Sequence, residues 1–243
     1  MKAIVLAAGK GTRLGDLTKD IPKPMLPVNG VPLLERILLW LKNNGIHEIG
    51  VNLFTMPEKI IDYFGTGAKL GVEIHYIQEK ELSGTAGALP KFADWLDNEE
   101  SFLVVYGDIL TDQDLTPIIE LHSEKNAFAT ILLHRRAKSN SFIKMNADGR
   151  ISEFIERPDE ETLKELQRRN PNGFLVNSAV QALSWRALEK ISETNAFDLP
   201  KDLYIPCIDK EDIYGVELTG KRVAIDSPER LRLAEEMFPC GER

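Results

Sequence analysis

The first two dozen residues constrain the fold most strongly. A short apolar run at residues 3–8 leads into Gly9-Lys10-Gly11-Thr12-Arg13-Leu14, and Pro22-Lys23-Pro24 follows. Glycines let a backbone pass close to phosphate oxygens, while arginine and lysine supply the positive charge that a polyphosphate needs. The pattern therefore predicts a strand that ends in a phosphate-binding loop.

Three better-known nucleotide motifs do not match this loop. The dinucleotide fingerprint requires a glycine where Leu14 stands. A P-loop requires Gly-Lys-Ser/Thr after a four-residue gap, and the spacing and order here differ. The protein-kinase loop is excluded because neither His-Arg-Asp nor Asp-Phe-Gly follows in the chain.

The combination of LAAGKGTRL at residues 6–14 with IPKPMLPV at residues 21–28 resembles the sugar-1-phosphate nucleotidylyltransferases, also called nucleotide-sugar pyrophosphorylases. The resemblance covers nearly the whole chain. It continues in GTAGA at 84–88, VYGD at 105–108, FIERP at 154–158, Asn177, FD at 197–198, KD at 201–202 and IDSPE at 225–229. It implies a glycosyltransferase-A-like fold, and the helical pattern at residues 229–238 suggests a catalytic core without a following β-helix.

Hydrophobic periodicity agrees with an α/β fold. Strands are expected at residues 2–6, 48–53, 72–76 and 102–106, and helices at 33–42, 58–64 and 86–95. The second half adds strands at 129–133, 142–145 and 151–154 around a turn at 147–149. This alternation predicts a Rossmann-like, mostly parallel mixed sheet with helices on both faces. The glycine loop and Asp108 then meet at the carboxyl ends of the strands, where such sheets bind ligands.

Length and composition suit one enzyme domain. With 243 residues, 43% of them hydrophobic, the chain is expected to form a single nucleotidyltransferase domain over residues 1–243. Residues from 1 to about 125 form its expected nucleotide-binding half, and those from about 126 to 243 its sugar-phosphate-binding half. No linker composition separates the two halves.

Charge and cysteine content exclude several other classes. A net charge of −8 argues against a nucleic-acid-binding surface, which is usually basic. Cys207 and Cys240 are too few for a disulfide framework or a zinc site, and no apolar run is long enough to span a membrane. A cytoplasmic location is expected. The sequence leaves the oligomeric state open, including a homo-oligomer.

The family resemblance implies that a sugar 1-phosphate attacks the α-phosphorus of a nucleoside triphosphate. Positioning and charge neutralisation dominate such a reaction. Arg13 matches a ligand of the triphosphate and the leaving group, and Lys23 matches a ligand of the α-phosphate or sugar phosphate. The expected nucleotide-binding residues are Leu6, Ala8, Gly9, Gly11, Thr12, Gln78, Gly84 and Thr85. For Gln78, a solvated strand end is the alternative.

A Mg2+ cofactor is expected, since this hard ion prefers carboxylate and phosphate oxygens. Asp108 is the first candidate ligand. Many relatives carry Asp-Ile-Gly-Thr-Pro where this chain reads Ala224-Ile225-Asp226-Ser227-Pro228, so the second ligand is expected at Asp226. The alternative for Asp226 is a cap on the following helix.

Asp112 and Asp114 resemble a metal-binding Asp-x-Asp pair, but capping of the next helix is the expected role.

Three polar residues, Glu156, Asn177 and Lys201, match the family's sugar-phosphate-binding positions. Polar groups of this kind select hydroxyls because a mismatched substrate leaves them unpaired. Two segments depart from the family: residues 140–142 read Asn-Ser-Phe rather than Tyr-Gly-Val, and residues 177–179 read Asn-Ser-Ala rather than Asn-Ala-Gly. These departures favour an unusual acceptor.

The leading hypothesis is a Mg2+-dependent sugar-1-phosphate nucleotidylyltransferase, similar to mannose-1-phosphate or heptose-1-phosphate guanylyltransferases. The first alternative is a cytidylyltransferase that acts on phosphocholine or another phosphorylated alcohol. The second is a catalytically silent homologue that binds a nucleotide sugar and regulates an active partner.

Overall fold

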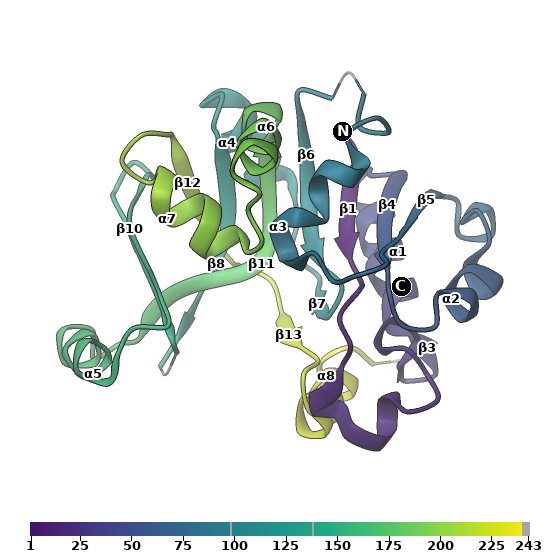
Figure 1. Ribbon diagram of the computed structural model, residues 1–243. Coiled ribbons are helices and arrows are strands. Elements are labelled where there is room, and N and C mark those ends of the chain that lie inside the picture. The colour runs from purple at the N-terminus through teal and green to yellow at the C-terminus, as the bar shows by residue number, and fades with distance from the viewer. Residues whose placement is uncertain (98, 138, 240–243) are drawn as a thin grey trace. The chain divides into compact units, whose positions relative to one another are not determined.

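The computed structural model describes residues 1–97, 99–137 and 139–239, and the chain divides into two compact units (Figure 1). Unit 1 comprises Met1–Ser83, Lys91–Asp114 and Thr219–Arg243. Unit 2 comprises Gly84–Pro90 and Leu115–Leu218. The end of the chain therefore belongs to the same unit as its beginning.

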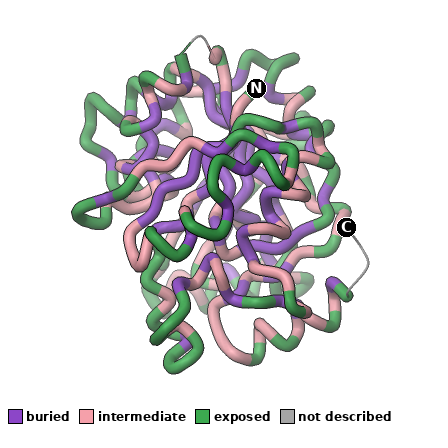
Figure 2. Tube along the Cα trace, turned by 90° about the vertical axis from the view of Figure 1, so that its right-hand side faces the viewer, coloured by how far each residue is buried: buried purple, intermediate pink, exposed green. Residues whose placement is uncertain are grey.

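Unit 1 is built on four parallel strands in the order β6-β1-β4-β5. They are β1 (Ala3–Leu6), β4 (Glu48–Leu53), β5 (Glu73–Gln78) and β6 (Ser101–Tyr106). Leu6 pairs with Asn52 on one side and with Tyr106 on the other, so the carboxyl ends of these strands are aligned. Most residues of β1, β4 and β6 are buried, as expected for near-continuous apolar strands of a parallel sheet. Figure 2 shows the buried residues of the chain in purple.

Helices and short strands complete unit 1. They are β2 (Pro27–Val28), β3 (Val31–Pro32), α1 (Leu33–Asn43), α2 (Pro57–Phe64), β7 (Ile109–Thr111), β13 (Arg222–Ala224) and α8 (Pro228–Met237), with 3₁₀ turns at Thr12–Thr18, Lys23–Met25 and Ala68–Leu70. Helix α1 forms because Leu34, Ile37, Leu38 and Leu41 recur at helical spacing and are buried on one face.

The segment after Leu218, which belongs to unit 1, is hydrogen-bonded to the segment around Asp108. Strand β13 pairs antiparallel with β7, and Ile225 N donates to the carbonyl oxygen of Asp108 at 2.8 Å. The capping role expected for Asp112 is wrong, while that of Asp114 stays a prediction. Asp112 Oδ1 instead accepts from Lys221 N at 2.6 Å, and buried Gln113 Oε1 accepts from the N–H groups of residues 219 and 220. Leu115, the residue directly before helix α4 (Thr116–Glu124), makes no side-chain cap bond.

Unit 2 contains five strands in the order β12-β8-β11-β9-β10. They are β8 (Ala129–Arg136), β9 (Ser141–Met145), β10 (Ile151–Glu156), β11 (Phe174–Ser184) and β12 (Ile213–Glu217). Only the β12–β8 pair is parallel among these described pairings; the others are antiparallel. The expected turn at 147–149 connects β9 and β10, with Gly149 N donating to Asn146 O at 3.0 Å.

The α-helices of unit 2 are α3 (Gly84–Gly87), α4, α5 (Glu160–Arg169), α6 (Trp185–Thr194) and α7 (Ile205–Cys207). A 3₁₀ turn at Leu89–Phe92 continues into unit 1, and residues Leu199–Tyr204 form a π-helical segment.

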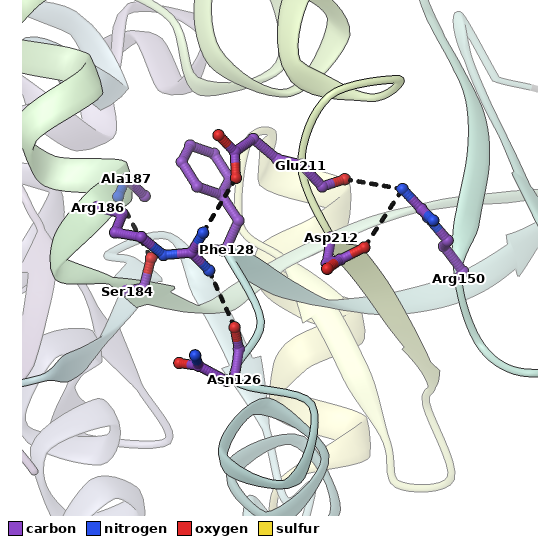
Figure 3. A network of polar contacts seen from close by, with 8 residues as sticks. All are labelled: Asn126, Phe128, Arg150, Ser184, Arg186, Ala187, Glu211 and Asp212. Carbon is purple, nitrogen blue, oxygen red and sulfur yellow. Dashed lines mark hydrogen bonds and ion pairs between the residues drawn. The ribbon is translucent and has the colours of Figure 1, made fainter.

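A polar network fixes the start of α6 (Figure 3). Arg186 donates to Glu211 and to the Asn126 carbonyl, while Ser184 Oγ bonds Phe128 O at 3.1 Å and caps Ala187 N.

The α/β class is confirmed, with parallel strands in unit 1 and a mixed sheet in unit 2. One element was predicted wrongly. Residues 86–95 do not form a single helix, because the chain passes from the short α3 into the 3₁₀ turn at Leu89–Phe92. Pro90 explains the break, since proline lacks an N–H and clashes within a helix interior.

Within the residues described, no helix is long and apolar enough to cross a membrane. Cys207 is buried with its thiol free, and burial raises its pKa. Cys240 lies outside the described residues.

Candidate active site

The glycine-rich loop begins where β1 ends. Gly11 has φ +66, a left-handed conformation that favours glycine. A Cβ atom at this position would also lie 3.0 Å from Thr18 Cγ2 and 3.2 Å from Lys23 Cβ. Gly11 therefore allows the Lys23 segment to approach the loop closely. By contrast, a Cβ added at Gly9 would meet no protein atom within 4 Å.

Lys23 lies in a 3₁₀ turn between two prolines, which restrict its backbone. Its Nζ donates to Asp108 Oδ2 at 2.9 Å, and its side chain is only 11% exposed. Asp108 follows β6, at the carboxyl ends of the parallel strands. The structure thus places an immobilised cation and a carboxylate at the edge where this sheet type binds ligands.

Arg13 forms the second cation–carboxylate pair. Its Nη1 lies 3.0 Å from Asp226 Oδ2, although the two residues are 213 positions apart. The Arg13 side chain is 74% exposed, so it can change partner more freely than Lys23. The alternative role of Asp226 as a helix cap is wrong, because the hydroxyl of Ser227 caps α8 by accepting from Arg230 N.

Asp108 and Asp226 are joined through the backbone. Ile225 N bonds Asp108 O, so the two carboxylates project from adjacent, hydrogen-bonded segments of unit 1. Among the described residues, no group of three or more His, Cys, Asp or Glu side chains is arranged to hold a metal ion. Two carboxylates nevertheless suit Mg2+, which usually takes one or two from protein and its other oxygens from phosphate and water.

The other nucleotide-binding candidates of unit 1 surround the same strand ends. Leu6 ends β1, Ala8 and Gly9 follow it, and Thr12 opens the next 3₁₀ turn. Gln78 is the exposed last residue of β5, two strands away from β1. Unit 1 therefore gathers every predicted nucleotide and metal residue except Gly84 and Thr85.

Gly84 and Thr85 belong to unit 2, where they contact the loop at residues 197–199. Gly84 has φ +74, and a Cβ there would lie 2.1 Å from the carbonyl oxygen of Phe197. Thr85 Oγ1 accepts from Leu199 N at 2.9 Å, and Ala86 N donates to Phe197 O at 3.0 Å. The segment predicted to recognise the base is thus fastened to the loop that precedes Lys201.

Glu156 and Lys201 lie close enough to interact electrostatically. Burial raises the pKa of Glu156 above its ordinary value, and the charge of Asp198 adds to this effect. Ser141, Arg157 and Lys201 favour the charged form and offset part of the rise. The result is a half-buried carboxyl group with mixed charges around it, which suits recognition of polar groups on a substrate.

Asn177 lies within β11, level with Glu156. Leu175 pairs with Ile143 of β9, and Ser141 of β9 pairs with Glu156, so the register aligns Asn177, Ser141 and Glu156 across the three strands. The Asn177 side chain also has a structural role, because its Oδ1 accepts from Ala179 N at 2.6 Å. This bond accompanies a register shift between Asn177 and Gln181.

Sequence reasoning missed a buried polar pair in unit 1, Asn52 and Glu79. Asn52 Oδ1 accepts from Ala7 N at 2.7 Å, and its Nδ2 donates to Glu79 at 2.5 Å. Burial favours a raised pKa for Glu79, but bonds from Ser83, Asn52 and Lys91 outweigh it and lower the pKa. The signal was an asparagine near the end of an otherwise apolar strand.

A family model described as nucleotidyl transferase matches residues 2–197, most of the chain. The chain belongs to the nucleotidyl transferase family. The matched region covers the glycine loop, Lys23 and Asp108, but it ends before Asp226. The predicted family is therefore confirmed, while the roles of individual residues stay predictions.

Curated relatives of this nucleotidyl transferase act on several sugar phosphates, by their names. A UTP–glucose-1-phosphate uridylyltransferase from Synechocystis is 32% identical over 223 residues, which are 86% of this chain and 55% of the relative. A D-glycero-alpha-D-manno-heptose 1-phosphate guanylyltransferase from Campylobacter jejuni is 42% identical over 118 residues, 49% of this chain and 52% of the relative. The chain spans about half the length of the curated relatives it matches.

Solved structures share the fold over nearly the full chain. HddC from Yersinia pseudotuberculosis, in a structure complexed with GMP-PN, has a TM-score of 0.78 and 24% identity, covering 98% of this chain and 99% of HddC. An apo UDP-glucose pyrophosphorylase has a TM-score of 0.80 and 20% identity, covering 97% of each chain. At these identities the nucleotidyl transferase shares their fold, and the predicted glycosyltransferase-A-like architecture is confirmed.

Proposed function

We propose that this chain transfers a nucleoside monophosphate from a nucleoside triphosphate to a sugar 1-phosphate, forming a nucleotide sugar and pyrophosphate. The observation that carries the proposal is the pair of contacts Lys23–Asp108 and Arg13–Asp226, held side by side by the hydrogen bond from Ile225 N to Asp108 O. Family membership and the names of the relatives support it.

The reaction requires one phosphorus–oxygen bond to form and another to break. A phosphate oxygen of the sugar 1-phosphate attacks the α-phosphorus, and the bond to the β-phosphate breaks as pyrophosphate leaves. Both substrates are polyanions, so neutralising their charge is the main task of the protein. Lys23, fixed between prolines, is assigned to the α-phosphate, and the exposed Arg13 to the triphosphate and departing pyrophosphate.

Asp108 and Asp226 are the proposed Mg2+ ligands. When bound, the ion would neutralise phosphate charge and help to orient the substrates. The two carboxylates pair with Lys23 and Arg13, so these four charged side chains have no net charge. Binding of phosphates then allows each cation to exchange a carboxylate for a phosphate oxygen.

The acceptor side is assigned to Glu156, Asn177 and Lys201. We further assign GTP with mannose 1-phosphate or a heptose 1-phosphate as substrates, since guanylyltransferases are among the relatives. The open space around Gly9 supports close approach of a phosphate to the loop. Gln78 and the Gly84–Thr85 segment are the candidates for reading the base.

The test is pyrophosphate release with Mg2+, using GTP, UTP, dTTP, CTP and ATP against a panel of sugar 1-phosphates. We expect acceptor-dependent release that is fastest with GTP and mannose or heptose 1-phosphate. Phosphocholine serves as the control acceptor, and its use with CTP would favour the cytidylyltransferase alternative. Binding of a nucleotide sugar without any release would contradict the proposal and favour a regulatory homologue.

A further inference from the structure

Glu79 is a buried carboxylate at the end of the three adjacent strands β1, β4 and β5. Its side chain is only 1% exposed. It follows β5 directly, and its N–H donates to Leu53 O of β4 at 2.8 Å. A charge buried this completely is costly unless it is paired and hydrogen-bonded. Its partners therefore show which parts of the molecule the carboxylate organises.

The first partner, Asn52, connects Glu79 to the glycine-rich loop. A carboxylate only accepts hydrogen bonds, so Asn52 must turn its amide Nδ2 toward Glu79. That orientation leaves Asn52 Oδ1 facing Ala7 N, which donates to it at 2.7 Å. Ala7 is the first residue after β1, where the chain turns toward Gly9. Glu79 thus determines, through Asn52, how the backbone enters the loop.

The second partner, Ser83, connects Glu79 to the segment before Gly84. Glu79 Oε2 accepts from Ser83 N at 2.9 Å and from Ser83 Oγ at 2.6 Å. Lys91 Nζ lies 3.2 Å from the same carboxylate and donates to Ser83 Oγ at 2.9 Å. The carboxylate and Lys91 together fix the residue that directly precedes the predicted base-reading segment.

We propose that Glu79 is a positioning residue for the nucleoside triphosphate, acting through Asn52 on the start of the glycine loop and through Ser83 on the start of the segment at 84–85. The inference rests on the proposed function, since it assigns these two segments to the nucleotide. Glu79 is buried, and it acts through the two backbone segments that its hydrogen-bond partners hold.

The charge on Glu79 is essential to this arrangement. A glutamine at position 79 keeps the size of the side chain but replaces one acceptor oxygen with an NH2 donor. That donor would face either the NH2 group of Asn52 or the N–H and hydroxyl of Ser83. One of the two connections is then lost while the fold of the strands is retained.

The experiment compares Glu79→Gln with wild type and with Glu48→Gln. Glu48 gives a matched control, because it lies at the opposite end of β4, where its half-exposed carboxylate pairs with Lys2. Binding of GTP and of UTP, each with Mg2+, is measured by calorimetry, and pyrophosphate release gives KM for both substrates. We expect Glu79→Gln to raise the Kd and KM of the triphosphate about tenfold, as for one lost hydrogen bond to a charged group. In Glu79→Gln, the KM of the sugar 1-phosphate should stay within about twofold of the wild-type value. Glu48→Gln should match wild type in the Kd and KM of the triphosphate.

Hydrogen–deuterium exchange without nucleotide provides the second readout. In Glu79→Gln and in Asn52→Ala, exchange should rise at residues 7–14 and stay unchanged in α1. The milder Ser83→Ala variant should raise the triphosphate Kd about threefold while leaving exchange at residues 7–14 unchanged, because it removes one hydroxyl on the Ser83 side alone.

The outcomes separate the inference from the proposed function. A folded Glu79→Gln variant with wild-type triphosphate Kd, or with exchange raised equally in α1, would overturn the inference. Failure of wild type to bind either triphosphate would overturn the proposed function. In that case unchanged exchange at residues 7–14 in Glu79→Gln would also overturn the positioning role. If Glu79→Gln does not fold, Ser83→Ala decides, and an unchanged Kd would overturn the inference.

Discussion

The two groups of candidate site residues are built on different kinds of backbone. In unit 1, Lys23, Asp108 and Asp226 project from segments that parallel strands and short antiparallel pairing hold in place. In unit 2, Glu156 and Asn177 lie in strands β10 and β11, close to residues with left-handed backbone. Arg157, directly after Glu156, has φ +53, and Ala179, two residues after Asn177, has φ +65. The two cation–carboxylate pairs of the candidate site lie in unit 1, whereas the non-glycine residues with positive φ that lie within two positions of a candidate are in unit 2.

This difference suggests a division of labour. Neutralising phosphate charge requires cations close to the strand ends, and the ion pairs of Lys23 with Asp108 and of Arg13 with Asp226 hold two cations there. Selecting one acceptor requires polar groups in particular orientations, and strained backbone is often kept where it orients such groups. Variants in unit 1 should therefore lower turnover, while variants in unit 2 should mainly change acceptor KM.

The largest effect is expected for Lys23→Ala in unit 1. Turnover should fall about 100-fold or more, the scale for losing one preorganised charge-stabilising donor. Steady-state pyrophosphate release measures this. Lys59→Ala is the matched control, because Lys59 is an exposed lysine on α2 whose Nζ donates to the Asp20 carbonyl. Near-wild-type turnover in Lys23→Ala would remove the residue from the catalytic assignment.

Substitution of the two carboxylates sharpens the unit 1 side of the comparison. Asp108→Asn should raise the Mg2+ concentration for half-maximal activity by about 10- to 100-fold or more, since losing even a supporting group of a metal site has this effect. Asp226→Asn should act in the same direction. EDTA should abolish activity in wild type.

The second ligand position is tested by adding Ala224→Asp to Asp226→Asn. We expect no recovery, because Asp226 is proposed to have taken over the role. Recovery of Mg2+ affinity would instead assign the ligand to position 224, where many relatives carry aspartate.

A smaller effect is expected for Glu156→Gln in unit 2. Loss of a hydrogen bond to a charged group should raise the KM of the sugar 1-phosphate about 10- to 100-fold, with a smaller change in the triphosphate KM. A fall in turnover with unchanged acceptor KM would break the division of labour between the units.

The same variant should change the pH dependence of stability. The folded-state pKa of Glu156 is raised, mainly by burial, so its stabilising contribution is present below the unfolded pKa and is lost as pH rises through the folded pKa. Glu156→Gln should remove this loss and raise the melting temperature relative to wild type at pH 7 but not at pH 4. Thermal unfolding at both pH values measures it, and an equal shift at both would contradict the assignment.

The smallest effect is expected at Ala179. Left-handed backbone costs an L-residue about 1–2 kcal/mol, and glycine avoids this cost. Ala182 is a matched control, because it is a buried alanine in the same strand without a positive φ. Ala179→Gly should therefore be more stable than Ala182→Gly by about 1 kcal/mol in urea unfolding. Equal stabilities would show that the backbone at Ala179 carries no strain.

Much of unit 1 could be predicted from local sequence. The strand at 48–53 and the start of α1 at Leu33 match the expected bounds, because buried parallel strands and amphipathic helices leave clear apolar patterns. The break within residues 86–95 was missed because apolar spacing outweighed Pro90 in the prediction. Ser227 rather than Asp226 caps α8, a choice between neighbouring residues that depends on backbone geometry.

The sequence by itself determined the family, the glycine loop and the identity of the candidate cations and carboxylates, since these depend on residue type and local spacing. Only the tertiary structure decided the partners. It pairs Arg13 with Asp226 across 213 positions, and it assembles Ala7, Asn52, Glu79 and Ser83 into one buried network. Such contacts depend on strand register and on the pairing of buried polar groups, and neither leaves a periodic signal in the chain.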